Sequence, residues 1–216
     1  MGPLGRPGAP SFKMAARRQR TTTGREETKL QRVLFSIDRI SMYVGKTFAW
    51  FVLILTLITS YDILATKFFR APTSWAYDVS VALYGTLFMM GGAYALSRNA
   101  HVRGDIFYSR WSPRRQATVD VLLYVLFFFP GIIALVSVGA QWAWYSFGIR
   151  ELSSQSPIQT PVWPFKMVIP IASAFLLLQG VAEFIRCIIA IRTGAWPPRL
   201  GDVEETESRL AKESQF

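Results

Sequence analysis

Long uncharged stretches of mostly apolar residues alternate with shorter charged segments along the chain. An α-helix rises about 1.5 Å per residue, so roughly 20 apolar residues cross the ~30 Å hydrocarbon core of a bilayer. The pattern therefore predicts an all-α integral membrane protein with four transmembrane helices and short interfacial amphipathic helix segments. The predicted spans cover residues 47–65, 78–97, 120–144 and 166–191.

These spans define a predicted transmembrane domain of residues 41–193, flanked by two polar segments. Residues 1–40 form a basic cytoplasmic arm and residues 194–216 an acidic tail, and their low apolar content predicts partial disorder in the arm and disorder in the tail. Within the arm, apolar residues recur at helical spacing at Leu30, Val33, Leu34 and Ile37. This spacing fits either an amphipathic helix on lipid headgroups or a solvated helix that leads into the first span.

The distribution of Lys and Arg predicts the orientation of the spans. These residues are dense in the arm, in the connection between the second and third spans, and in the tail, and they are sparse in the other two connections. The positive-inside rule then places both termini in the cytoplasm. Aromatic residues are typical of membrane interfaces, and they gather at the opposite, outer side: Trp75, Tyr77, Trp142, Trp144, Tyr145 and Trp163.

Composition excludes several functions. The formal charge of +10 sits in blocks between the spans and not in a stripe on a folded surface, so we expect no nucleic-acid partner. The sequence has one histidine, His101, and one cysteine, Cys187. A membrane haem protein or a metal cluster needs several such ligands. We therefore expect no metal, no cofactor and no enzymatic activity.

Two ionisable residues, Glu183 and Arg186, interrupt the fourth span. Charged residues inside a membrane helix are functional candidates. Their i,i+3 spacing places them on one face, and we favour a salt bridge near the inner interface. An ion-coupling carboxylate and a contact to a partner subunit are the alternatives. Asp62, Asp78 and Asp120 fall at span ends, where a carboxylate costs little.

Small and irregular residues mark two other spans. Gly91 and Gly92 lie in the middle of the second span, and small residues there allow helices to approach closely. The neighbouring helix belongs either to this chain or to another chain. In the third span, Pro130 and Gly131 predict a kink.

The connections before the third and fourth spans carry a distinctive combination of motifs. The connections read His101-Val102-Arg103-x-Asp105, Ser112-Pro113, Glu151-x-Ser153-Ser154 and Pro161-x-Trp163-Pro164-x-Lys166. The fourth span continues with Ile169-Pro170 and Leu176-Leu177-Leu178-Gln179-Gly180-x-Ala182-Glu183. With these motifs, the chain resembles the small membrane subunit of tripartite ATP-independent periplasmic (TRAP) transporters over residues 34–192.

The resemblance implies a multi-pass subunit of the bacterial inner membrane that scaffolds a larger membrane subunit. A periplasmic solute-binding protein delivers an organic acid or similar solute to the pair, and a sodium gradient drives uptake. Three groups of residues are candidate contacts under this interpretation. They are His101, Arg103 and Asp105 for the cytoplasmic connection; Glu151, Ser154, Trp163, Pro164 and Lys166 for the outer connection; and Gly91, Gly92, Gln179 and Glu183 for helix contacts.

Two other functions remain as alternatives. A self-sufficient four-helix transporter that works as a dimer would need an unpaired carboxylate deep in a span, whereas Glu183 lies near one end of its span with Arg186 beside it. A membrane enzyme or electron carrier is opposed by the single histidine and single cysteine.

Overall fold

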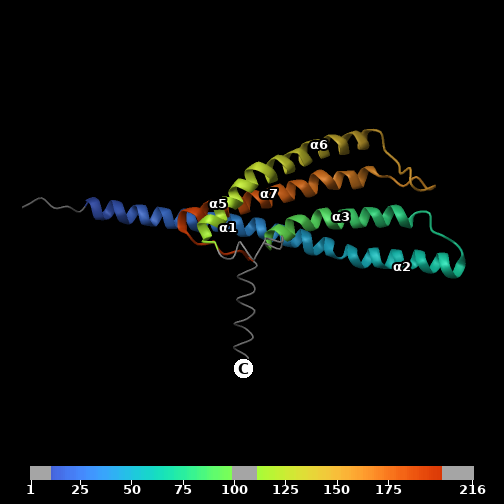
Figure 1. The fold of residues 1–216 in the computed structure, drawn as a ribbon, viewed down its shortest axis with the longest axis horizontal. Helices are drawn as coiled ribbons and strands as arrows, with labels where there is room; N and C mark the ends of the chain where they lie inside the picture. The colour runs from blue at the N-terminus through green and yellow to red at the C-terminus, as the bar shows by residue number, and fades with distance from the viewer. Residues whose placement is uncertain (1–10, 99–110, 201–216) are drawn as a thin grey trace, which may run out of the picture. The chain divides into compact units, whose positions relative to one another are not determined.

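The computed structural model describes residues 11–98 and 111–200, with side chains from residue 29 onward. Nearly all of the described residues are helical (Figure 1). The helices are α1 Ser11–Ala49, α2 Phe51–Phe69, α3 Ala76–Ser97, α5 Pro113–Leu123, the π-helix η1 Tyr124–Phe128, α6 Phe129–Gly148 and α7 Trp163–Thr193. The only extended pairing among these residues is a single bridge between Leu152 and Pro161. The predicted all-α class is confirmed.

Four helical stretches in the described residues are long and apolar enough to cross a membrane. They are Lys29–Phe69, Ala76–Ser97, Pro113–Gly148 and Trp163–Thr193. Large apolar side chains such as Leu57, Phe68 and Phe88 are exposed on them, which suits hydrocarbon surroundings. The predicted four-span membrane protein is therefore confirmed, while the cytoplasmic placement of both termini stays a prediction.

The helical stretch that contains the predicted first span, residues 47–65, begins well before it. A turn at Trp50 separates α1 from α2, yet Trp50 keeps helical backbone angles, and the N–H groups of Leu53 and Ile54 donate to its carbonyl. The chain divides into two compact units, residues 1–36 and 37–216, so α1 belongs partly to each.

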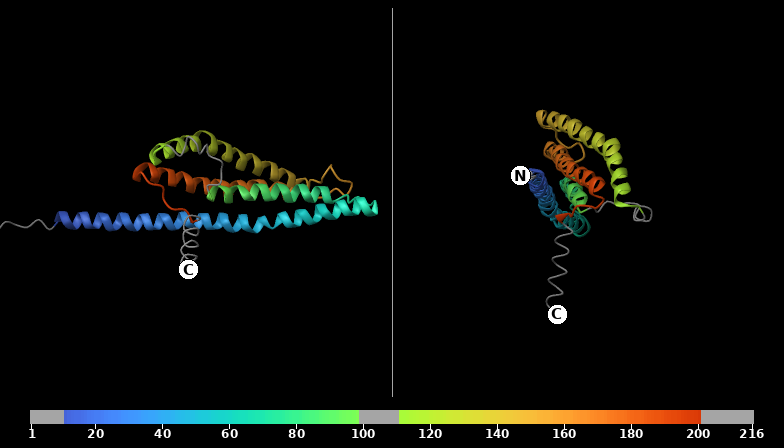
Figure 2. Two further views of the ribbon diagram at one scale, coloured as in Figure 1. Left: turned by 60° about the horizontal axis from the view of Figure 1, so that its bottom comes forward. Right: turned by 90° about the vertical axis from the view of Figure 1, so that its left-hand side faces the viewer.

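Helix α7 is the centre of the second unit, with α3 against one part of it and α5, η1 and α6 against another (Figure 2). Helix α2 packs on α3. Small side chains on α7 explain its position, because they let neighbouring backbones approach closely in a membrane. The buried small residues of α7 are Ala172, Ser173, Gly180, Ala182, Cys187 and Ala190.

The irregularity predicted in the third span lies just before Pro130. Proline has no N–H to donate, and the helix widens into a π-turn in which the Phe129 N–H donates to the Tyr124 carbonyl. The Phe128 ring from this turn lies directly over Gly180 of α7, where a Cβ atom would stand 2.1 Å from Phe128 Cε1. Gly180 therefore makes room for the aromatic side chain that the π-turn presents to α7.

Candidate functional site

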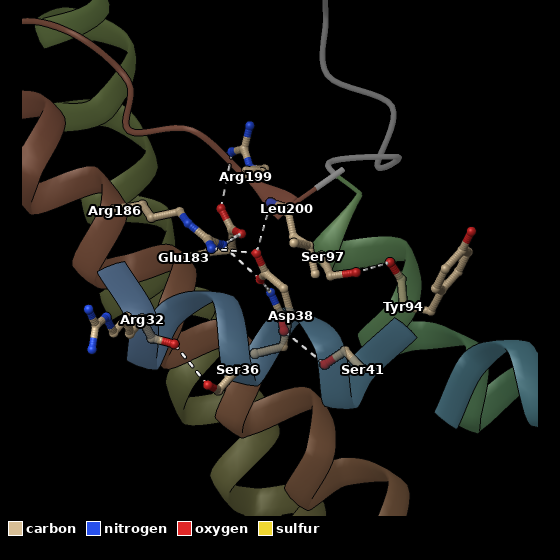
Figure 3. A network of polar contacts seen from close by, with 11 residues as sticks. Arg32, Ser36, Asp38, Ser41, Tyr94, Ser97, Glu183, Arg186, Arg199 and Leu200 are labelled. Atoms are coloured by element: carbon tan, nitrogen blue, oxygen red, sulfur yellow. Dashed lines mark hydrogen bonds and ion pairs between the residues drawn. The ribbon is translucent and has the colours of Figure 1, made fainter. Parts of the chain in front are cut away.

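A buried ion-pair network joins α1, α7 and the segment that follows α7 (Figure 3). Arg186 is 0% exposed, Asp38 1% and Glu183 2%. The guanidinium group of Arg186 donates to both oxygens of Asp38, at 2.6 and 3.1 Å, and to Glu183 Oε1 at 2.5 Å. Arg186 thus bridges a carboxylate of another helix and the carboxylate one turn earlier on its own helix.

Further polar groups complete this network. Gln179 donates its amide to Asp38 at 2.9 Å and accepts from the Ser41 hydroxyl at 2.8 Å. Arg199, beyond the end of α7, binds the second oxygen of Glu183 at 3.1 Å. The network therefore pairs two carboxylates with two guanidinium groups, so its formal charges balance.

The charge balance determines what the network can do. An isolated charge in a low-dielectric interior is costly, whereas a paired and hydrogen-bonded set is tolerated. Glu183 has two cationic partners, so its carboxylate is held as a structural anion. This arrangement contains the Glu183–Arg186 salt bridge that the i,i+3 spacing predicts, and it adds a long-range partner, Asp38.

A second polar cluster lies at the opposite end of α7, where residues 149–162 connect α6 to α7. This connection folds back on itself: the Ser153 N–H donates to the Thr160 carbonyl at 2.8 Å, and the Val162 N–H donates to the Glu151 carbonyl at 3.0 Å. The fold directs two hydroxyl groups at Asp78, near the start of α3. Ser153 donates to Asp78 at 3.1 Å and Ser156 at 2.5 Å. The connection is thereby tied to α3.

An ion pair also ties this connection to α7. The Lys166 ammonium donates to Glu151 at 2.5 Å and lies 4.1 Å from the centre of the Trp142 ring of α6. The hydrogen bond from Lys166 lowers the pKa of Glu151 below its ordinary range, whereas burial acts in the opposite direction. Glu151, Lys166 and Trp142 thus link the connection with both helices that it joins.

We expect this ion pair to make stability depend on pH in the acid range. Because the folded-state pKa of Glu151 is depressed, its contribution is present above the unfolded-chain pKa of about 4.3 and is lost as the pH falls through the lower folded-state pKa. Thermal unfolding in detergent should give Glu151→Gln a lower midpoint than the parent chain at pH 7. The difference should close between about pH 5 and pH 3.

Arg150→Gln is the matched control for this prediction, because Arg150 is adjacent to Glu151 and its side chain lies over the Phe147 ring instead of in the ion pair. Its midpoint should follow that of the parent chain at every pH. A gap between the parent and Glu151→Gln that stays constant down to pH 3 would contradict the assignment.

The remaining candidates fall in several places. Gly92 faces α7, where an added Cβ would touch Leu176 at 3.8 Å, whereas a Cβ at Gly91 would meet nothing within 4 Å. Trp163 packs edge-to-face on Phe147, Pro164 occupies the first turn of α7, and Ser154 is exposed. His101, Arg103 and Asp105 lie outside the described residues, as does the tail from residue 201.

Sequence reasoning missed Asp38, Ser41 and Ser156, and within the motif Glu151-x-Ser153-Ser154 it selected Ser154 and not Ser153. A signal for Asp38 exists: Ser41, Met42 and Gly45 follow it at spacings of three, four and seven residues, so an acid shares one helix face with small and apolar residues. Such an acid needs a buried cation. The contacts of the two serines with Asp78 depend on how the connection folds, and no local sequence pattern predicts them.

Four membrane-spanning helical stretches and balanced internal ion pairs define a multi-pass membrane protein. Residues 29–98 and 111–200 contain no group of three or more His, Cys, Asp and Glu that could hold a metal ion. A sequence model of one family, described as "Tripartite ATP-independent periplasmic transporters, DctQ component", matches residues 55–190. This match covers more than half of the 216 residues, and the chain therefore belongs to that family, the small membrane component of TRAP transporters. No curated protein matches the chain.

Proposed function

We propose that this chain is a static scaffold for a larger membrane subunit, which carries the solute through the bacterial inner membrane. A periplasmic solute-binding protein supplies an organic acid or similar solute, and a sodium gradient drives its uptake. The chain itself contributes no catalytic step. Family membership supports the presence of partner subunits, because the family is a component of tripartite transporters.

The observation that carries the scaffold role is that each carboxylate described within the four spans is engaged by the chain itself. Asp38 and Glu183 share the buried network, Asp62 accepts from Thr73, and Asp78 accepts from two serines. Asp120, the remaining one, also has a partner. Ion-coupled transport requires a carboxylate that can release and rebind its ion, and the two buried carboxylates Asp38 and Glu183 are held in ion pairs by guanidinium groups of the chain. The alternative of a self-sufficient dimeric transporter loses its best candidate, Glu183.

The orientation and the contact surface are further parts of the proposal. Both termini lie in the cytoplasm, supported by the distribution of Lys and Arg. Because Gly92 faces α7 and Gly91 faces open space, the Gly91 side of α3 is the surface we assign to the large subunit. Small residues on an open helix face permit close approach of a second helix.

Reconstitution tests the function. The chain, the large membrane protein encoded beside it and the adjacent secreted binding protein are purified and incorporated into liposomes in every combination. We expect sodium-driven uptake of an organic acid only when all three are present. Uptake by the chain alone would overturn the scaffold role in favour of the dimeric transporter.

Co-purification tests the contact surface. Gly91→Leu should reduce recovery of the large subunit on a tagged chain, whereas Gly131→Leu, at an equally open position on α6, should not. Equal recovery with both variants would place the contact elsewhere on the chain.

A further inference from the structure

A groove of about 550 Å³ lies between α3, α6 and α7, next to the 149–162 connection. This volume falls in the range of small-molecule pockets, roughly 300–1,000 Å³. Its lining is apolar at Val81, Met89 and Ile169, and it is polar at Asp78 and Lys166, near the starts of α3 and α7; we call this polar end its mouth. The polarity therefore changes along the helices, from charged at the span ends to apolar within the spans.

The mouth of the groove presents a carboxylate that has no cationic partner among the described residues. Asp78 accepts hydrogen bonds from the hydroxyl groups of Ser153 and Ser156, and it forms no ion pair with any side chain in residues 29–98 and 111–200. A carboxylate offers about four lone-pair sites, so it retains acceptor capacity for a cation.

The same mouth presents an ammonium group with unused donors. An ammonium has three N–H donors, and Lys166 uses one of them on Glu151. The side chain is only 12% exposed and is fixed by the ion pair and by the Trp142 ring. An anion that enters the groove therefore meets a positioned donor.

The walls of the groove open to the surroundings of the helices. Val81 and Trp142 are both about half exposed, and both belong to membrane-spanning helices. Molecules that reach the groove come from the bilayer. An aqueous solute does not have the apolar length that the apolar lining would cover.

We propose that the groove binds one phospholipid whose headgroup carries a primary ammonium, the phosphatidylethanolamine type. The lipid ammonium pairs with Asp78, the phosphate accepts from Lys166, and one acyl chain lies along Val81, Gly85 and Met89. This inference does not rest on the proposed scaffold function. It rests on the membrane class of the chain and on the two opposite charges at the mouth.

The bilayer is the solvent of this groove, and this determines which contacts can select one lipid over another. An acyl chain is already in hydrocarbon, so moving it into an apolar groove gains little free energy from the hydrophobic effect. The headgroup contacts must therefore discriminate between lipids. A choline headgroup has no N–H to donate to Asp78, and a glycerol headgroup brings the phosphate without a cation. A charge-assisted hydrogen bond contributes enough to favour ethanolamine by about tenfold in affinity.

Native mass spectrometry of the full chain in detergent tests this proposal. The delipidated protein is titrated with phosphatidylethanolamine, phosphatidylcholine and phosphatidylglycerol that carry identical acyl chains. We expect about tenfold tighter binding of the first lipid. Asp78→Asn keeps one acceptor oxygen for one serine and turns the other position into an NH2 group, from which the second serine hydroxyl can accept. It should bind ethanolamine and choline lipids equally. Asp62→Asn, a carboxylate of α2 outside the groove, should preserve the preference.

A second variant separates the groove from the rest of the surface. A Cβ at Gly85 meets nothing within 4 Å, so Gly85→Leu fills the groove without a clash and should remove the selective site. Gly91→Leu, on the same helix and equally open, should retain it. Equal affinity of the parent chain for the three lipids, or a preference that survives Asp78→Asn or Gly85→Leu, would overturn the proposal.

Discussion

Replacing Arg186 with methionine should lower the free energy of unfolding by about 3–5 kcal/mol, the usual cost of breaking a buried ion pair by removing one partner. Methionine has a similar length and fills the space, so the loss comes from charge. Asp38 loses the guanidinium group that binds both of its oxygens, and Glu183 retains only Arg199. For the two buried carboxylates, the network then holds a single guanidinium group, that of Arg199.

Thermal unfolding in detergent, followed by size-exclusion recovery of the monodisperse protein, measures this effect. Arg192→Met is the matched control, because Arg192 lies on the same helix and is exposed. It should change the midpoint little. The triple variant Asp38→Asn, Glu183→Gln, Arg186→Met should recover much of the loss, because the network then contains no carboxylate. An Arg186→Met midpoint close to that of Arg192→Met would refute the structural role of the network.

The network also shows which features of this fold can be derived from sequence. The spans follow from apolar length, and the Glu183–Arg186 pair follows from i,i+3 spacing, because both depend on residues close in the chain. The Asp38–Arg186 pair joins residues 148 positions apart. No periodicity specifies which distant helix meets α7, so the cationic residue could be found but its main partner could not.

The connection of residues 149–162 illustrates a different limit. Its motif residues Glu151 and Lys166 are recognisable in sequence, and the structure joins them in an ion pair. Ser153 and Ser156 bind Asp78, and their positions depend on how the connection turns. In this turn Arg150 and Gln159 adopt positive φ angles of 51° and 56°. These residues rarely adopt such angles, so sequence alone does not predict the turn.

Both polar clusters bear on the proposed function in the same way. Each joins a helix end to a segment distant in sequence: the Arg186 network joins α7 to α1, and the Asp78 cluster joins α3 to the 149–162 connection. The Lys166–Glu151 ion pair joins this connection to α7, so α7 is fixed near both ends. A helix fixed in this way suits a subunit that holds its shape while a partner moves, and it does not suit a helix that rocks during transport.

The contact of α1 with α3 gives the second large expected effect. A Cβ atom at Gly45 would stand 2.4 Å from Tyr94 Cβ and 2.7 Å from Tyr94 Cγ. Real Cβ atoms do not approach so closely. Neither the new Cβ at position 45 nor the Cβ of Tyr94 can move away by side-chain rotation, because each is fixed by its own backbone. Gly45→Ala must therefore separate the two helices, and overpacking of this kind costs about 1–3 kcal/mol.

Alanine at an open glycine of the partner helix should have the opposite effect. Gly91→Ala places its Cβ in open space on α3, and alanine is favoured over glycine inside a helix by up to about 1 kcal/mol. We expect unfolding midpoints in detergent to fall for Gly45→Ala and to stay equal or rise for Gly91→Ala. Because Gly45 lies seven residues after Asp38 on the same helix face, the displacement should also loosen the Asp38–Arg186 pair. Arg186→Met should then cost less in the Gly45→Ala background than in the parent chain, and strictly additive losses would mean that the α1–α3 contact and the ion-pair network are independent.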